Sequence, residues 1–310
     1  MTIKQFMRKA TLVISEGEKA LDLSSMHFTF RTAQQDVESP NNCAIRIYNL
    51  SEQTVKRAMV EFSQVTLQAG YEDALGVIFQ GTIKQFRVGR ENATDTYLDI
   101  LAADGDLAYN QSVVAKTLAA NSTPSQRVQA AIEAMGNHGV TAGQSMQFTG
   151  GILPRGKVLF GMARALLRQE VQSQGATWSI NNGKVDILPL TGYKPGTAVV
   201  LNSTTGLIGR PEQTIDGLKA RCLINPRLVI GGLIQIDNKT INQTVQQNPN
   251  AAPIPFNQYT GLQNLATVAA DGLYRLYVVE HVGDTRGTDW YSDLVGLAIN
   301  PVTSRVISNG

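Results

Sequence analysis

The sequence predicts a mainly β protein in which a small α+β insert separates two related antiparallel β-domains. Three observations support this fold class. Apolar and polar residues alternate through most of the chain with the period of two that is typical of half-buried strands. Helical patterns are concentrated in residues 106–190. A segment near residue 95 recurs near residue 290, and an internal repeat of this kind indicates duplicated β-domains.

The repeat has the pattern Thr-Asp-x-Tyr-x-Asp followed by two apolar residues, and it occupies positions 94–101 and 288–295. Each copy closes a run that starts at a glycine, Gly76 or Gly272, and then passes through a turn. The glycine-to-threonine distance differs by two residues between the copies (76 to 94 and 272 to 288), a difference that the turn can absorb. The alternative is chance similarity between two β-hairpins of like composition.

The composition limits the possible functions. A chain of 310 residues suggests two or three domains, and 43% apolar with 17% charged residues indicates a folded protein. The 27 basic and 25 acidic residues are dispersed, which is unlike a dedicated nucleic-acid binder. No apolar run approaches the roughly 18 residues of a membrane-spanning helix. Residues 1–10 are not followed by an apolar segment, so we expect no secretory signal and synthesis in the cytoplasm.

The cysteines and histidines predict neither a metal site nor a cofactor. Cys43 and Cys222 lie far apart in strand-like runs, which favours buried free thiols over a disulfide. The three histidines are isolated and match no metal-ligand spacing.

Residues 1–105 are expected to form the first β-domain. Alternation predicts strands over 26–30, 43–48, 65–69 and from residue 83 onward. One helix is expected to start at the N-cap Ser51 and to bury the apolar positions of its helical face. These positions are Val55, Met59 and Phe62.

Residues 106–190 are expected to form the α+β insert. Thr123 to Gln126 is a capping-box pattern with proline at the first helical position, and it is followed by an apolar stripe at Val128, Ile132 and Met135. A second helix is expected from about 156 to 174. Two alternating runs then flank Asn182-Gly183, which predicts a hairpin with a type I′ turn.

Residues 191–310 are expected to form the second β-domain, with strands over 218–224 and 228–236. The segment 238–271 is rich in Asn, Gln and Pro and breaks the alternation. We expect it to be a long excursion between two strands that lies outside the core and faces a partner or a lumen.

Several segments together resemble the central hub proteins of the baseplate in contractile-tailed bacteriophages, a module shared with contractile injection systems. They include the strand leading into the first helix, the middle hairpin and two parts of the second β-domain. The segments are 42–51, 67–71 with 79–83, 178–189, 223–228 and 281–290. The excursion at 238–271 matches no fixed feature of that family.

The resemblance implies two tube-type antiparallel β-barrels, 1–105 and 191–310, with the helical and hairpin module 106–190 between them. It implies a homotrimeric ring that joins the sixfold tail tube to the threefold central spike and lines the DNA channel. The implied partners are the spike, the tube or tube-initiator protein and, as further candidates, baseplate wedge proteins, with DNA only in transit. The implied location is the tail baseplate of the virion, after assembly in the host cytoplasm.

Two other function classes stay open: a β-rich carbohydrate-binding or host-adhesion tail module, and a hydrolase. His281, Asp284, Asp289 and Ser292 could supply an acid, a base and a nucleophile, but this segment is more simply a hairpin turn, so we expect no enzyme. The structural or interface candidates are Asp99, Asp293, Trp290, Arg286 and Trp178. We expect hydrogen bonding from the aspartates and core or interface packing from the tryptophans.

Overall fold

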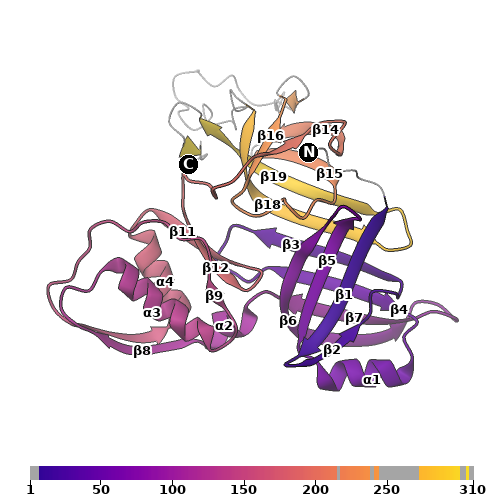
Figure 1. Ribbon diagram of the computed structural model, residues 1–310, viewed down its shortest axis with the longest axis horizontal. Helices are drawn as coiled ribbons and strands as arrows, with labels where there is room; N and C mark the ends of the chain where they lie inside the picture. Colours follow the sequence, from indigo (N-terminus) through magenta and orange to yellow (C-terminus); the bar gives the residue numbers. More distant parts are fainter. Residues whose placement is uncertain (1–6, 215–216, 238–240, 244–271, 301–304, 307–310) are drawn as a thin grey trace, which may run out of the picture.

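The computed structural model describes residues 7–214, 217–237, 241–243, 272–300 and 305–306. Strands dominate it, which confirms the mainly β fold class. Most strands belong to one sheet that contains both the first and the last part of the chain (Figure 1). None of the described helices is long and apolar enough to cross a membrane.

The first part of the chain builds one half of this sheet around helix α1. Its elements are β1 (Arg8–Glu16), β2 (Lys19–Asp22), β3 (Phe28–Gln35), β4 (Asn42–Tyr48), α1 (Glu52–Glu61), β5 (Gln64–Tyr71), β6 (Ala74–Arg90) and β7 (Thr96–Ala103). The spatial order is β3-β4-β7-β6-β5-β1-β2. Neighbouring strands in this order are antiparallel.

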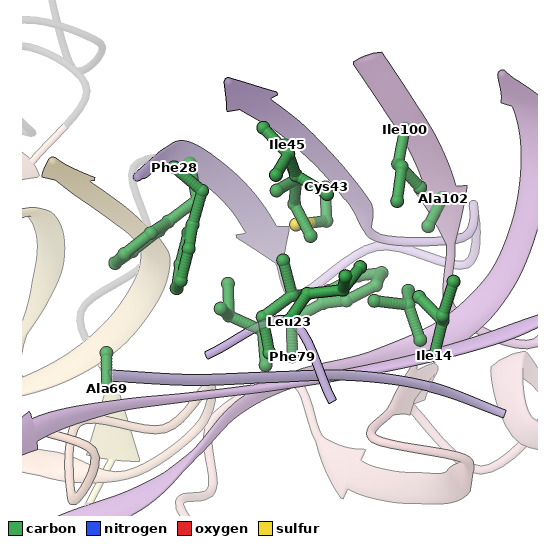
Figure 2. Packing of buried hydrophobic residues seen from close by; sticks show 14 of the residues in the cluster. Ile14, Leu23, Phe28, Cys43, Ile45, Ala69, Phe79, Ile100 and Ala102 are labelled. Atoms are coloured by element: carbon green, nitrogen blue, oxygen red, sulfur yellow. The ribbon is translucent and has the colours of Figure 1, made fainter. Parts of the chain in front are cut away.

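The sheet bends over its own apolar side chains. Figure 2 shows Ile45 and Ile100, from β4 and β7, on one side of the core, with Ile14 and Phe79, from β1 and β6, on the other. A barrel would require β3 and β2, the two outer strands of this half, to pair with each other. The described pairings do not close the half in this way, because β3 pairs instead with β18 (Leu273–Asp284), near the end of the chain.

Helix α1 starts as predicted, since the Ser51 hydroxyl accepts a hydrogen bond from the backbone N–H of Thr54. Two of the three expected positions pack, since Phe62 is buried and Val55 lies against the core. The third expectation is wrong, because Met59 is exposed and Ala58, one residue earlier, is buried instead.

The insert contains α2 (Asp106–Gln111), β8 (Val113–Leu118), α3 (Pro124–Gly136), β9 (Thr141–Ala142), β10 (Lys157–Met162), α4 (Ala163–Gln172), β11 (Ala176–Asn181) and β12 (Lys184–Pro189). The capping box of α3 is present, with both reciprocal hydrogen bonds. The hairpin between β11 and β12 is also as predicted. Asn182 and Gly183 have φ angles of 51° and 73°, as a type I′ turn requires.

The expected start of the second helix in the insert is wrong. Residues 157–162 form β10, which pairs with β8, and α4 begins only at Ala163. In β10, Leu159 is buried while Val158 and Phe160 are exposed, which is a period of two. The apolar residues at 159, 162, 163 and 166 also fit a helical face, and only the pairing with β8 decides between the two periods.

The second part of the chain adds β13 (Val199–Leu201), β14 (Leu207–Thr214), β15 (Gly217–Leu223), β16 (Leu233–Ile236), β17 (Asn242–Gln243), β18 (Leu273–Asp284), β19 (Trp290–Asn300) and β20 (Arg305–Val306). The expected strand over 228–236 is only 233–236 long, because Gly231, with φ 76°, turns the chain before it. Of the expected excursion at 238–271, residues 238–240 and 244–271 lie outside the described part of the chain.

The buried apolar side chains form three clusters. One lies mainly within residues 12–102, the second within 108–187 and the third within 201–298. Ile224 and Trp290, from the last part of the chain, belong to the first cluster. The first and last parts of the chain therefore share core residues.

Strands β18 and β3 connect the two halves of the sheet. We call this pairing the internal junction: residues 278–284 of β18 run antiparallel to residues 29–35 of β3. Beside it, Arg275 and Asp36 form a buried ion pair, and Arg275 also donates to the backbone oxygen of Leu190, 3.1 Å away, at the end of the insert. Both halves and the insert therefore meet at Arg275.

The insert is also held by polar contacts to the first half. The Asn41 amide donates to the backbone oxygen of Ile180 at 2.8 Å, and the Asp104 carboxylate accepts backbone hydrogen bonds from Asn182 and Gly183. Burial raises the pKa of Asp104 to about 6.

Candidate assembly interface

Both copies of the sequence repeat begin a strand and build the same cluster of side chains. In the first copy, Asp99 on β7 accepts two hydrogen bonds from Arg46 on β4, with N–O distances of 2.7 and 3.0 Å. The guanidinium carbon of Arg46 also lies 4.0 Å from the ring centre of Tyr97. The carboxylate and the aromatic face thus hold the arginine in one orientation.

The second copy repeats this geometry on β15 and β19. Arg221 donates to Asp293 at 2.7 and 2.9 Å, and its guanidinium carbon lies 4.1 Å from the ring centre of Tyr291. Hydrogen bonding to the aspartates raises the pKa of both guanidinium groups. We call each set an Arg–Asp–Tyr cluster.

Sequence reasoning found the aspartates and tyrosines of these clusters but missed the arginines. A signal was present, because Arg46 and Arg221 each lie between two apolar residues in an alternating strand. Each arginine is directly opposite its aspartate on the neighbouring strand.

The correspondence extends over four strands. The order β3-β4-β7-β6 in the first half matches β14-β15-β19-β18 in the second. Arg87 on β6 stands opposite Asp99, and Glu280 on β18 stands opposite Asp293. Both β6 and β18 have an irregularity at the same place, between Ile83 and Gln85 and between Leu276 and Val278.

The clusters lie on the face of the sheet that points away from the cores, which we call the outward face. Arg31 on this face is paired with Glu280 at 2.7 Å. Three arginines of the outward face are thus neutralised by three carboxylates: Arg31 by Glu280, Arg46 by Asp99 and Arg221 by Asp293. A surface with charges paired in this way holds no concentrated positive charge at these positions.

The remaining site candidates lie in different places. Trp290 is buried in the first core with its ring edge-on to Phe30, at 5.8 Å between ring centres. Trp178 is buried in the insert beside Tyr109. Arg286 lies in an exposed turn, where its backbone N–H donates to Asp284. The structure therefore does not bring these residues together, and Asp99 and Asp293 are separated by β18, β3 and β4.

His281 and Ser292 are close together but cannot reach a substrate from solution. Their Nδ1 and Oγ atoms are 2.7 Å apart, and the residues are 1% and 0% exposed. Burial lowers the pKa of His281 to about 4. Asp284 bonds to His27 instead, at 2.8 Å from Nε2, so the four residues do not form a triad.

The two thiols are buried and free, which confirms the sequence prediction. Burial raises the pKa of Cys222 to about 12 and that of Cys43 further still. Among the described residues, no group of three or more His, Cys, Asp or Glu side chains is placed to hold a metal ion.

No protein-family model matches the sequence, and no curated protein resembles it closely enough to match. Solved structures do resemble the fold. The 43 kDa tail protein of prophage MuSo2 from Shewanella oneidensis has a TM-score of 0.57 at 8% identity, over 96% of this chain and 99% of that one. A tail protein from Neisseria meningitidis MC58 has a TM-score of 0.55 at 8% identity, over 94% and 96%.

A third similar structure is the Escherichia coli c3393 protein, with a TM-score of 0.53 at 9% identity over 89% of this chain and 74% of that one. It is described as a component of the type VI secretion system with structural similarity to the T4 bacteriophage tail proteins gp27 and gp5. The chain thus has the fold of phage tail proteins and of a secretion-system component that is structurally similar to such proteins.

Proposed function

We propose that this chain is a central hub protein of a contractile-tail baseplate and that it assembles as a homotrimeric ring. The observation that carries the proposal is the duplication of four strands with their Arg–Asp–Tyr clusters. Three chains, each with two similar halves, present six similar sheets around an axis. Such a ring fits a sixfold tail tube on one side and a threefold spike on the other.

The three apolar clusters support a division into domains at the boundaries that the sequence suggests: 1–105, 106–190 and 191–310. The first and third would be the two tube-type domains, and the second would be an insert that extends away from them (Figure 1).

The outward face has the character expected of a channel lining. Three of its arginines, Arg31, Arg46 and Arg221, are held by carboxylates, and the chain as a whole carries a net charge of only +2. Free arginines and lysines would neutralise phosphates and release counterions, which binds DNA tightly. A channel with paired charges lets DNA pass without holding it.

The partners of this ring would be the central spike and the tail tube or tube-initiator protein, with baseplate wedge proteins as further candidates. The similarity of the c3393 protein to gp27 and gp5 supports this assignment. The ring would be assembled in the host cytoplasm and lie in the baseplate of the virion. It would have no catalytic role, in keeping with the burial of His281 and Ser292.

The test is the mass of the purified chain by light scattering, alone and co-expressed with the spike protein, together with negative-stain images. We expect a mass near three times 33.5 kDa and ring-shaped particles with threefold symmetry. A chain that stays monomeric both alone and with the spike would contradict the proposal, and binding of a cell-surface glycan by that monomer would favour an adhesion module.

A further inference from the structure

The internal junction has counterparts at the two ends of the four-strand repeats. In that junction β18 pairs with β3. Because β18 corresponds to β6 and β3 corresponds to β14, the equivalent pairing would join β6 of one chain to β14 of another. The last part of β6 and the outer edge of β14 are therefore the two surfaces to compare with the internal junction.

The last part of β6 is an exposed strand edge. Within the described residues, β6 beyond Ile83 pairs with β7 alone. Val88 in this part is 54% exposed, whereas the equivalent residue, His281, is 1% exposed because β3 covers it. The unpaired backbone N–H and C=O groups of such an edge can bind another strand, and an exposed apolar side chain beside them favours this pairing.

Within the part of the chain that the structure describes, the outer edge of β14 contains a buried acceptor without a donor. Gln213 is 8% exposed, and among the described atoms its Oε1 has no hydrogen-bond partner. Its equivalent on β3 is Thr32. Gln213 is opposite Leu218, three residues before Arg221, and Thr32 is opposite Cys43, three residues before Arg46. The Thr32 hydroxyl accepts from the backbone N–H of His281, 3.2 Å away, across the internal junction.

The two edges therefore match as donor and acceptor. Val88 is the residue equivalent to His281. In a pairing of β6 with β14, the backbone N–H of Val88 would therefore be placed to donate to Gln213 Oε1, as the N–H of His281 donates to Thr32. Leaving a buried acceptor unpaired costs free energy, and this cost favours association with a strand that satisfies it.

The charges across the two pairings are also complementary. At the internal junction, Arg31 on β3 bonds to Glu280 on β18. Their equivalents are Glu212 on β14 and Arg87 on β6, so the same diagonal contact between chains would pair opposite charges with their places exchanged. Cross-strand pairs of opposite charge stabilise one register over others.

Strand β17 occupies part of this edge in the single chain. Among the described residues, it pairs in parallel with β14 at two positions, Glu212 and Gln213. No described atom bonds to Gln213 Oε1, and the internal junction by contrast pairs seven residues of each strand. The longer antiparallel partner would therefore displace β17.

We propose that β6 of one chain pairs antiparallel with β14 of a second copy, with Arg87 opposite Thr214, Val88 opposite Gln213 and Gly89 opposite Glu212. This proposal rests on the hub function and specifies how its ring closes. Three such pairings alternate with three internal junctions, and the outward faces of three chains become one continuous sheet. The interface is heterologous, and its closure limits the assembly to a ring.

The test is a disulfide between chains in the variant Arg87→Cys/Thr214→Cys. The matched positive control is Ala33→Cys/Glu280→Cys, the equivalent pair at the internal junction. The register control is Gln85→Cys/Thr214→Cys, which moves one thiol by two residues on the same face. Both native thiols are buried and stay unreacted. After mild oxidation we expect covalent species of two and three chains in the test variant, at about tenfold higher yield than in the register control.

A second variant pair measures the interface without cysteines. Val88→Lys places a charge on the β6 edge, and Val60→Lys places the same charge on the surface of α1, where Val60 is 84% exposed compared with 54% for Val88. We expect the first variant to weaken association about tenfold or more and the second to leave it unchanged. Both should keep the melting temperature of the single chain, because both valines are exposed in it.

Three outcomes would overturn the pairing. A trimer by light scattering without the expected disulfide, while the positive control forms, would reject this register and leave the hub function standing. Covalent species longer than three chains would reject ring closure. Unchanged association in Val88→Lys would show that the β6 edge lies outside the interface, whatever the function of the chain.

Discussion

The two halves of the sheet share one side-chain cluster on the face that points away from the cores, where two other charged positions are exchanged in sign, and they differ on the face that points into the cores. The strand order, the irregularity in β6 and β18 and the Arg–Asp–Tyr clusters recur. On the core side, Leu98 and Val88 of the first half correspond to Ser292 and His281 of the second. Duplicated domains need a packed core, but many side chains can fill it. The retained outward face therefore has a constraint of its own, which a channel lining would supply.

The two halves also differ in whether their outer strands are paired: β3 and β18 pair with each other at the internal junction, whereas β6 beyond Ile83 pairs on one side only among the described residues. At the internal junction, polar core residues are covered and the ion pair of Arg275 with Asp36 is sealed from water. At the ends of the repeats, an apolar residue of β6 is exposed, and an acceptor on β14 has no partner among the described atoms. The proposed pairing of these two edges between chains would account for the difference.

The largest expected effect is at the buried ion pair of Arg275 with Asp36, beside the internal junction. Replacing Arg275 by Leu leaves the Asp36 carboxylate buried without its partner, and we expect the free energy of unfolding to fall by about 3–5 kcal/mol. The double variant Arg275→Leu/Asp36→Leu should regain most of this loss. Urea unfolding measures both variants.

The counterpart of Arg275 in the first half is Thr82. Thr82 is opposite Ala103 on β7, and Arg275 is opposite the equivalent residue, Leu297, on β19. Thr82→Ala should cost only about 1 kcal/mol, the value of one hydrogen bond, here from Gln64. Equal losses in Arg275→Leu and Thr82→Ala would mean that the ion pair does not hold the junction.

The second effect concerns pH. His281 is neutral in the folded chain because burial lowers its pKa to about 4, whereas the unfolded chain binds a proton below about pH 6.5. More protons on the unfolded state mean that stability falls as the pH drops from 6.5 to 4, by about 3 kcal/mol in all.

The variant His281→Val/Ser292→Leu gives the second half the core side chains of the first, and we expect it to lose this acid-dependent destabilisation. Urea unfolding at pH 7.5 and pH 4 measures the difference between the variant and the native chain. An unchanged pH dependence would assign the acid sensitivity to other groups. Asp104 cannot account for it, because its raised pKa makes the fold more stable as the pH falls toward 4.

The third effect is steric. A Cβ atom on Gly283 would lie 2.3 Å from the Cζ atom of Phe30 across the internal junction. Gly283→Ala should therefore cost about 1–3 kcal/mol through overpacking. The equivalent residue on the open edge is Arg90, and Arg90→Ala should change stability by less than about 0.5 kcal/mol. Thermal unfolding compares the two, and a neutral Gly283→Ala would mean that the junction is loosely packed.

The smallest effect compares the two clusters. The Asp99 carboxylate is 16% exposed and that of Asp293 is 38% exposed. Water screens the second ion pair more, so we expect Asp99→Asn to cost about 1 kcal/mol and Asp293→Asn less than about 0.5 kcal/mol in the single chain. Chemical unfolding at low and at high salt measures both variants, and the reverse order of losses would contradict the screening argument.

Local patterns predicted much of the fold. The capping box at Thr123, the cap at Ser51 and the Asn182-Gly183 turn depend on neighbours a few residues away, and all three are present. The start of the second helix of the insert was wrong because residues 157–162 fit both periods. Their strand depends on β8, about 40 residues earlier in the chain.

The sequence by itself determined the mainly β class, the repeat, the free buried thiols and the side chains that face outward, because alternation and composition are local properties. The tertiary structure decided which strand edges meet. The internal junction joins residues about 250 positions apart, and no local pattern in β3 or β18 specifies the other. It also decided that Arg46 and Arg221 hold the repeated aspartates, because opposite positions on neighbouring strands are defined only once the strands are paired.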